Sequence, residues 1–241
     1  MGRKSIGKRP MTSARRQKRY RLRKKRMAKG AEKRQARELR MAAMVKRTER
    51  AQLKLEAMAR IYNVILADTP PHFENWSDVT GMDRAAENHY ETMTVEAIAA
   101  MGETVPAAPD CILYLWATVP LLRAMMRVLE RWGFRDSTHI VWVKTTLDGS
   151  KLKLGTGHEV INGHEILLIG KRGNVPSAVR GEQLPSVIFA PRREHSRKPE
   201  IIAEYIERMY PDEPKLEMFA REHREGWDQH GNELELIDPV T

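Results

Sequence analysis

The positive charge of this chain is concentrated at its amino terminus. Residues 1–60 carry 23 Lys and Arg against four Asp and Glu, whereas the other 181 residues carry 19 basic and 28 acidic residues. A segment with so many like charges cannot bury a core, because ionised side chains are costly to remove from water. We therefore expect a basic arm over residues 1–60 and a mildly acidic globular domain over residues 61–241.

The arm is rich in residues that favour helices and has no proline after Pro10. Thr12 or Ser13 can cap a helix, but Gly30 and charge repulsion oppose one, so a helical arm and a disordered arm both stay open. The apolar residues show no sustained heptad, which argues against a coiled coil. Because dense Lys and Arg attract polyanions, we favour an arm that binds nucleic acid over a merely solvated tail.

Apolar runs and helical patterns alternate through the rest of the chain, as an α/β domain requires. Strands are expected at residues 61–67, 111–117, 138–144, 165–170, 186–190 and 215–219. Helices are expected near residues 94–102, 120–133 and 199–211, where Thr, Pro and Gly stand at typical helix ends. The order of these elements predicts a sheet covered by helices.

Cysteine use and hydropathy exclude several classes of protein. The single cysteine, Cys111, cannot form an intrachain disulfide and is expected to be a small buried residue at the start of a strand. No apolar run has the length of a membrane span, and no hydrophobic signal core follows the basic start. We expect a soluble, intracellular protein without a membrane partner.

An acid and two prolines follow the first expected strand, in Ala67-Asp68-Thr69-Pro70-Pro71. Ligands of open α/β sheets bind outside the carboxyl ends of the strands, and proline fixes the backbone of such a turn. Asp68 is therefore a candidate functional carboxylate, although the same residues also make an ordinary tight connection.

Eight segments between Tyr90 and Glu233 occur in a diagnostic order. They are residues 90–94, 113–118, 132–134, 140–145, 193–199, 216–221, 226–227 and 231–233. Together they resemble the MT-A70 family, that of the eukaryotic messenger-RNA N6-adenosine methyltransferase catalytic subunit and its bacterial and phage relatives. With the first strand, the resemblance covers about three quarters of the chain. It implies a Rossmann-like, S-adenosylmethionine-dependent methyltransferase fold with permuted motif order, in which the catalytic turn precedes the cofactor strand.

The resemblance makes Asp68, Thr69 and Pro70 the catalytic turn. The lone pair of an exocyclic amine is delocalised into the adenine ring, so the Asp68 carboxylate and the Thr69 carbonyl would accept its two hydrogens. No metal ion is needed for this chemistry.

The resemblance also implies residues that bind the cofactor and the acceptor adenosine. Lys198 would pair with the carboxylate of S-adenosylmethionine, because the ammonium group of a lysine is a compact positive charge. The ribose hydroxyls and the adenine of the cofactor would be bound by Arg221, His223, Asn232 and Glu233. Tyr90 and Glu165 would lie near the acceptor adenosine, although Tyr90 could simply cap the domain and Glu165 could pair with Lys or Arg.

The turn departs from the family pattern of Asp-Pro-Pro followed by Trp, because Thr stands at position 69 and Pro at position 71. Read without a gap, the turn keeps Asp68, and His72, Phe73 or Trp76 would supply the aromatic surface for the target base. A shifted alignment would put the Thr69 hydroxyl in place of the acid. We prefer the unshifted alignment, with Phe73 as the substrate residue, because a carboxylate is the better acceptor.

Two functions fit these residues. The first is S-adenosylmethionine-dependent N6-methylation of adenine in nucleic acid, with DNA favoured over RNA because compact relatives look bacterial or phage-like. The second is a catalytically inactive nucleic-acid-binding pseudoenzyme or partner subunit, which the altered turn favours and the intact cofactor residues oppose. Methylation of a small molecule fits the basic arm poorly. We expect the cytoplasm of a bacterial or phage-infected cell, with nucleoid association, a dimer or a protein partner left open.

Overall fold

The computed structural model describes residues 12–56, 58, 60–71, 93–155, 159–175, 178–193, 197–231 and 234. Its contacts divide the chain into two compact units, residues 1–43 and 44–241. Four of the predicted site residues, Phe73, Tyr90, Asn232 and Glu233, lie outside the described residues.

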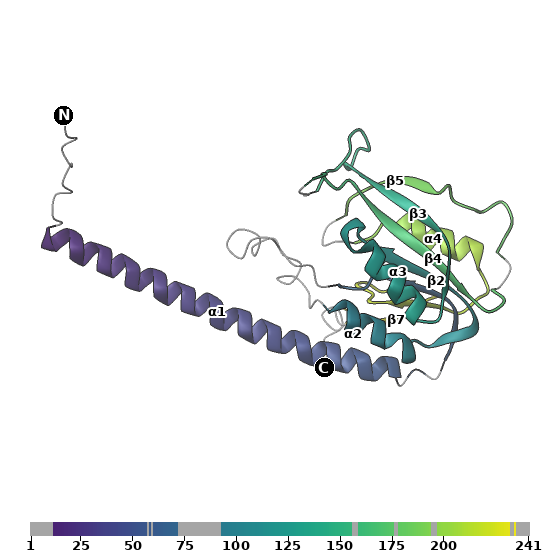
Figure 1. The fold of residues 1–241 in the computed structure, drawn as a ribbon, viewed down its shortest axis with the longest axis horizontal. Helices are drawn as coiled ribbons and strands as arrows, with labels where there is room; N and C mark the ends of the chain where they lie inside the picture. Colours follow the sequence, from purple (N-terminus) through teal and green to yellow (C-terminus); the bar gives the residue numbers. More distant parts are fainter. Residues whose placement is uncertain are drawn as a thin grey trace, which may run out of the picture. The chain divides into compact units, whose positions relative to one another are not determined.

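The described part of the arm is a helix, α1 (Ser13–Glu56), of 44 residues (Figure 1). Thr12 caps it, because the Thr12 Oγ1 accepts a hydrogen bond from the Arg15 amide at 3.4 Å. At 1.5 Å per residue the helix is about 66 Å long. Of the two alternatives left open by the sequence, the structure contains the helical arm.

The carboxyl end of α1 contributes to the core of the second unit. Leu55 is only 1% exposed and belongs to a cluster of buried apolar residues, against which Met58 also packs. The compact unit thus includes residues that precede position 60. The boundary expected after residue 60 stays a prediction. Truncated chains that begin at residue 44 or at residue 61 test it.

Seven strands form one sheet with the order β5-β3-β4-β2-β1-β6-β7 (Figure 1). They are β1 (Tyr62–Ala67), β2 (Ala107–Ala117), β3 (Arg135–Thr145), β4 (His164–Arg172), β5 (Val187–Pro191), β6 (Lys215–Met218) and β7 (Asp228–His230). Strand β4 is antiparallel to both of its neighbours, and every other neighbouring pair is parallel. Consequently the amino end of β4 lies at the same sheet edge as the carboxyl ends of β1, β2, β3 and β6.

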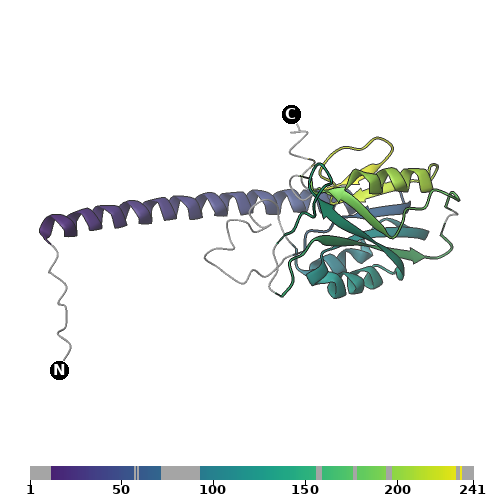
Figure 2. The same cartoon turned by 90° about the horizontal axis from the view of Figure 1, so that it is seen from above.

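Helices cover the two faces of the sheet. The helices α2 (Val95–Ala100) and α3 (Leu122–Arg131) lie on one face, and α4 (Glu200–Met209) lies on the other (Figure 2). Two short 3₁₀ turns, Met101–Glu103 and Val119–Leu121, adjoin α2 and α3. The N-cap of α2 is Thr94, whose side chain accepts a hydrogen bond from the Ala97 amide at 3.1 Å.

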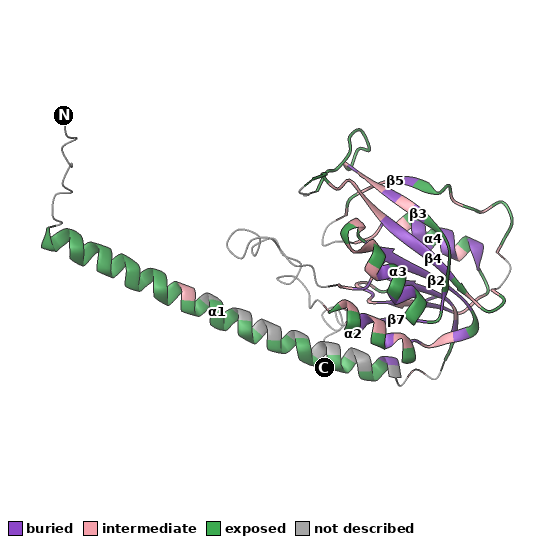
Figure 3. Cartoon of the chain, viewed as in Figure 1, coloured by how far each residue is buried: buried purple, intermediate pink, exposed green. Residues whose placement is uncertain are grey.

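The central strands are buried on both faces, which explains their nearly continuous apolar sequences (Figure 3). In β2, Leu113 and Leu115 belong to the core beneath α2 and α3, whereas Tyr114 and Trp116 belong to the core beneath α4. Successive side chains of a strand point to opposite faces, so one strand serves both cores.

The expected α/β fold is confirmed, and all six expected strands and three expected helices are present with shifted ends. The one described strand that the sequence did not predict is β7 (Asp228–His230), which is short and polar. Cys111 is buried as expected, and burial raises the pKa of its thiol to about 12. In the described part of the chain, no helix combines the length and apolar character needed to cross a membrane.

Candidate active site

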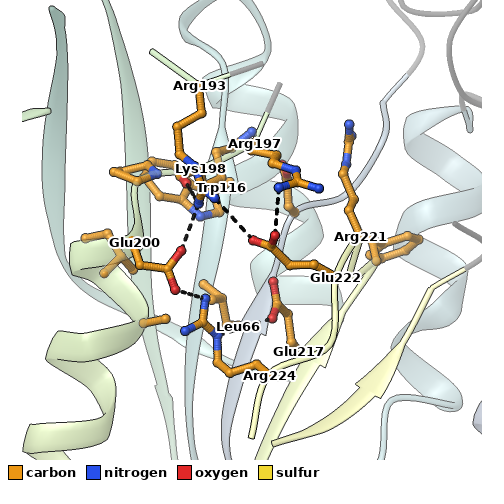
Figure 4. A pocket seen from close by; sticks show the side chains of 15 residues that line it. Leu66, Trp116, Arg193, Arg197, Lys198, Glu200, Glu217, Arg221, Glu222 and Arg224 are labelled. Carbon is orange, nitrogen blue, oxygen red and sulfur yellow. Dashed lines mark hydrogen bonds and ion pairs between the residues drawn. The ribbon is translucent and has the colours of Figure 1, made fainter. Parts of the chain in front are cut away.

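A cavity opens at the sheet edge where the carboxyl ends of the parallel strands meet (Figure 4). Its empty volume is about 510 Å³, part of it open to solvent. The lining comes from β1, β2 and β6, from the start of α4 and the segment that leads into it, and from the segments that follow β1 and β6. The lining residues are Leu66, Asp68, Trp116, Arg193, Arg197, Lys198, Pro199, Glu200, Ile202, Ala203, Glu217, Phe219, Arg221, Glu222 and Arg224.

Lys198 joins two acids at this edge. Its Nζ lies 2.7 Å from the Asp68 Oδ1 and 3.3 Å from the Glu165 Oε2. The same ammonium lies 5.5 Å from the ring centre of Trp116. Asp68 follows β1 and Glu165 is the second residue of β4, so the antiparallel direction of β4 brings these two acids together. The predicted residues Asp68, Lys198 and Glu165 therefore form one cluster.

Lys144, near the end of β3, completes the cluster. Its Nζ donates a hydrogen bond to the Glu165 Oε1 and lies 5.1 Å from the ring centre of Trp142. Burial alone would raise the pKa of Glu165, but the positive charges of Lys198 and Lys144 outweigh it and lower that pKa. The acids Asp68 and Glu165 likewise raise the pKa of Lys198 against the effect of its burial. The contacts within the cluster thus favour the charged forms of Glu165 and Lys198.

The two side chains of the turn point in different directions. Asp68 lines the cavity, whereas Thr69 is 5% exposed and its Oγ1 lies 4.0 Å from the Met125 Sδ. The Pro70 carbonyl accepts a hydrogen bond from the Met93 amide at 2.8 Å, which ties the turn to the start of the α2 region. This arrangement supports the unshifted alignment, because the carboxylate and not the hydroxyl of Thr69 faces the cavity.

Charged side chains form a second network across the cavity (Figure 4). Arg224 lies 2.6 Å from Glu200 and 3.8 Å from Glu217. Arg193 lies 2.8 Å from Glu200 and 3.6 Å from Glu222. These ion pairs fix the segment before α4 to the segment after β6.

Glu217 is the strongly perturbed acid of this network. Burial raises the pKa of Glu217 to about 7, although Arg224 opposes this. Among the described residues, no hydrogen-bond partner reaches the buried Glu217 Oε2. A buried acceptor of this kind, at the wall of a cavity, is available to a ligand donor.

The backbone after β6 is strained and closely packed. Phe219 has a φ of +62°, a left-handed conformation that is uncommon for residues other than glycine. The Ala220 amide donates a hydrogen bond to the His230 carbonyl at 2.9 Å. A Cβ on Gly231 would lie 2.2 Å from the Ala220 carbonyl oxygen, so only glycine fits there. This contact fixes the chain just before Arg221.

The remaining predicted cofactor residues are only partly described. Arg221 lines the cavity, whereas His223 is not among its lining residues. The His223 Nδ1 lies 2.9 Å from the Gln229 Oε1, an interaction that orients the ring. The predicted residues Asn232 and Glu233 directly follow Gly231 and lie outside the described part of the chain.

Sequence reasoning missed Lys144, Trp116, Glu217 and Arg224. Lys144, Trp116 and Glu217 stand inside the segments that carry the family resemblance, but no role followed from their residue types. Their position at strand ends is the signal that could have found them, because the carboxyl edge of an α/β sheet collects its functional side chains.

Comparison with known proteins decides the family. The family model described as MT-A70 matches residues 62–233. The chain belongs to the MT-A70 family. The match spans the sheet from β1 to the residues just after β7, and it leaves α1 outside.

Individual relatives agree with this family. The N(6)-adenosine-methyltransferase MT-A70-like protein of Drosophila melanogaster is 34% identical over 185 residues, which are 74% of this chain and 28% of that protein. The Type II methyltransferase M.MunI of a Mycoplasma species is 28% identical over 151 residues, which are 62% of each chain. The human N(6)-adenosine-methyltransferase catalytic subunit METTL3 is 32% identical over 184 residues, 74% of this chain and 30% of that protein. The chain therefore spans between 28% and 62% of the length of these three relatives.

MT-A70 methyltransferases use S-adenosylmethionine as the methyl donor. The lining of the cavity suits this cofactor chemically, because Lys198 supplies a cation for a carboxylate and the Glu217 Oε2 supplies an acceptor for a hydroxyl. The residues present therefore fit the cofactor of the family.

Proposed function

We propose that this protein transfers a methyl group from S-adenosylmethionine to the N6 amine of adenine in nucleic acid. The observation that carries the proposal is the Asp68 carboxylate in the cavity, held 2.7 Å from Lys198 at the carboxyl end of β1. The family membership of residues 62–233 supports the reaction class.

Bound S-adenosylmethionine supplies an electrophilic methyl group on a sulfonium sulfur. In the proposal, Lys198 pairs with the cofactor carboxylate, and Arg221 and His223 bind the ribose hydroxyls. Asn232 and Glu233 bind the cofactor adenine. Glu217, which no sequence argument had singled out, joins this set as an acceptor for a hydroxyl because its Oε2 is buried beside the cavity.

Asp68 accepts a hydrogen bond from one N–H of the adenine amine, and the Thr69 carbonyl accepts a hydrogen bond from the other. As the amine nitrogen bonds to the methyl carbon, the bond between that carbon and the sulfonium sulfur breaks, and the Asp68 carboxylate accepts the proton that the nitrogen then releases. These two acceptors orient the amine and stabilise the positive charge that develops on its nitrogen. Pro70 fixes the turn, which its hydrogen bond from Met93 also holds in place. The alignment of the two reacting groups supplies much of the rate, since fixed geometry lowers the entropic barrier.

The acceptor adenosine would contact Glu165, Tyr90 and Phe73. Glu165 already pairs with Lys198, so it also positions the lysine that lies between it and Asp68. Phe73 takes the stacking role of the missing tryptophan, and stacking on an aromatic side chain contributes about 1–3 kcal/mol per base.

We further propose that the nucleic acid is DNA and that the basic arm binds it. The similarity to the Type II methyltransferase M.MunI supports DNA, while the similarity to N(6)-adenosine-methyltransferases keeps RNA as the competing substrate. In duplex DNA the target adenine has to leave the base stack before its amine can reach Asp68. Such a reaction belongs to the cytoplasm of a bacterial or phage-infected cell, where DNA and the methyl donor are both present.

One feature favours a second candidate function, a catalytically inactive nucleic-acid-binding subunit. The turn reads Asp68-Thr69-Pro70-Pro71 and lacks the aromatic residue that the family pattern has directly after the prolines. Such a subunit would keep the fold and bind nucleic acid without turnover, and it would serve a catalytic partner.

Product analysis distinguishes the two candidates. The protein is incubated with S-adenosylmethionine and either adenine-containing DNA or RNA, and the nucleosides are then separated and identified. N6-methyladenine in the product supports the proposed methyltransferase activity. The polymer that contains more N6-methyladenine is the preferred substrate. Absence of product from a sample that binds the cofactor by calorimetry would support the inactive subunit instead.

A further inference from the structure

The amino-terminal part of α1 presents basic side chains without any acid. The segment Ser13–Lys29, called here the basic segment, contains ten Lys and Arg among 17 residues and no Asp or Glu. Every residue of the basic segment is exposed. Its carboxyl-terminal continuation within α1 is different, because acidic residues such as Glu32 and Glu38 stand among the basic ones there.

The basic side chains point to all sides of the helix. At about 100° per residue, Arg15 and Arg26 fall on one side, within roughly 20° of each other. Lys24 falls about 180° away from Arg15, and Arg21 falls on the third side. A helix that rested on a single row of phosphates would need cations on one side only. The distribution in the basic segment instead suits a cylinder with phosphates on opposite flanks.

We propose that the basic segment binds in the major groove of duplex DNA. This inference rests on the proposed binding of DNA by the arm and adds which segment binds and which groove it enters. A B-form major groove is about 12 Å wide, which admits an α-helix with its side chains, and it has a phosphate strand on each flank. The segment is about 25 Å long, enough to follow the groove over roughly seven base pairs.

The same geometry disfavours other polyanions. The major groove of A-form RNA is deep and narrow, so a helix with basic side chains on all sides cannot enter it. A membrane surface would require an apolar face opposite a charged one. In the basic segment Tyr20 and Met27 share a side, but Leu22 lies nearly opposite, and all three are more than half exposed. The segment therefore has no apolar face to insert into a membrane.

Binding to matched duplexes tests the proposal directly. The full chain, without S-adenosylmethionine, is titrated into a DNA duplex and into an RNA duplex of the same sequence. We expect the DNA duplex to bind at least about tenfold more tightly, with strong dependence on salt. On the DNA, bound protein is expected to protect guanine N7, in the major groove, from dimethyl sulfate and to leave adenine N3, in the minor groove, reactive. Equal affinity for both duplexes, or unprotected guanine N7, would overturn the proposal.

Matched variants separate the basic segment from net charge. R15Q/K24Q/R26Q removes three charges within the segment, whereas R34Q/K46Q/R50Q removes three exposed charges from the rest of α1. The first variant is expected to lose the guanine N7 protection and to lower the salt slope of log affinity by about 2.7. The second is expected to keep the protection. If both variants lost the guanine N7 protection equally, the net charge alone would account for the attraction, and binding of the basic segment in the groove would be refuted.

A third variant tests the helix itself. L22P keeps every charge but interrupts the helix in the middle of the basic segment. It is expected to keep salt-dependent binding and to lose both the preference for DNA and the N7 protection. Retention of both would refute the groove model. None of these measurements uses methyl transfer, so an inactive enzyme and a wrong groove assignment give different results.

Discussion

Two lysines share the carboxylate of Glu165 at the candidate active site. Lys144 and Lys198 approach its two oxygens from different elements, and only Lys198 also contacts Asp68. Lys144 thereby balances the charge of Glu165 independently of Lys198. In the proposed complex, in which Lys198 pairs with the cofactor carboxylate, Lys144 would still compensate the charge of Glu165.

Lys144→Met is expected to destabilise the protein at pH 7 by about 1–3 kcal/mol, because a part-buried carboxylate loses a charged hydrogen-bond donor. The variant should also raise the pKa of Glu165, so the stability that its ionised form provides is lost at a higher pH during acid titration. Denaturant unfolding at several pH values measures both effects. Lys171→Met, on the exposed side of β4, is the control, and equal stability of the two variants would contradict this account.

The contribution of Glu217 to stability is expected to change with pH in the opposite direction to that of Glu165. Its pKa is about 7 in the folded protein against 4.5 in the unfolded chain, so the folded state binds one more proton between these values. Its contribution to stability is present below pH 4.5 and is lost as the pH rises toward 7 and beyond. Glu217→Gln stays neutral throughout, so its melting temperature relative to the wild type should increase from pH 5 to pH 8. Glu204→Gln, at an exposed carboxylate on α4, is the control for loss of a carboxylate. The same melting-temperature difference at every pH for Glu217→Gln would argue against a raised pKa of Glu217.

Several residues of the site could be predicted from the sequence, but the contacts between them could not. Asp68 could be found because it follows an apolar strand, and Lys198 because it stands in a segment with family resemblance. The pairing of Lys198 with both Asp68 and Glu165 could not be predicted, since it depends on the antiparallel direction of β4. The strained φ of Phe219 likewise has no signal in its residue type.

Among the elements, the contact between the ends of β6 and β7 positions the part of the cavity wall that contains Arg221. Gly231→Ala should weaken this contact, because the new Cβ would meet the Ala220 carbonyl oxygen at 2.2 Å. We expect a loss of about 1–3 kcal/mol of stability, as for other overpacked sites, and weaker binding of S-adenosylmethionine through displacement of Arg221. Thermal unfolding and calorimetry measure the two effects.

Gly30→Ala is the matched control for this substitution. A Cβ on Gly30 meets no atom within 4 Å, and alanine favours a helix interior by about 0.5–1 kcal/mol over glycine. The control should therefore leave cofactor binding unchanged and stabilise α1. Normal stability and cofactor affinity in Gly231→Ala would contradict the close contact.

Most elements could be predicted because their sequences contain both an apolar pattern and a terminating residue. Thr94 marks the start of α2, and the apolar run of β2 marks a strand buried on both faces. Strand β7 escaped prediction because its three residues, Asp228-Gln229-His230, are polar and have no alternating pattern. It forms through parallel pairing with β6, a contact between residues distant along the chain.

In the whole molecule, the two ends of α1 belong to different compact units. Its amino-terminal part lies in the first unit, and its carboxyl-terminal end contributes Leu55 to the core of the second. Truncation to residues 44–241 should keep the stability of the globular unit, because Leu55 remains in its core. Truncation to residues 61–241 removes Leu55 and should cost about 2–5 kcal/mol. It also removes the ion pair in which Arg60 lies 3.2 Å from Asp228. Denaturant unfolding of both fragments measures the difference.

Leu55→Ala in the full chain is the control for the truncations, because it removes the core contact and keeps the arm. Equal stability of residues 44–241 and 61–241 would instead support a domain boundary after residue 60. Both fragments are expected to bind nucleic acid more weakly than the full chain, since both lack the basic segment.

Asp68→Asn tests whether Asp68 accepts a hydrogen bond from the reacting adenine amine. Single-turnover transfer of a labelled methyl group to DNA is compared with the wild type, and calorimetry on the same samples measures the affinity for S-adenosylmethionine. We predict that methyl transfer falls by roughly 100-fold to 1,000-fold while cofactor affinity stays within a few-fold, because asparagine keeps the shape but not the charge. Transfer at the wild-type rate would show that the Asp68 carboxylate takes no part in the reaction.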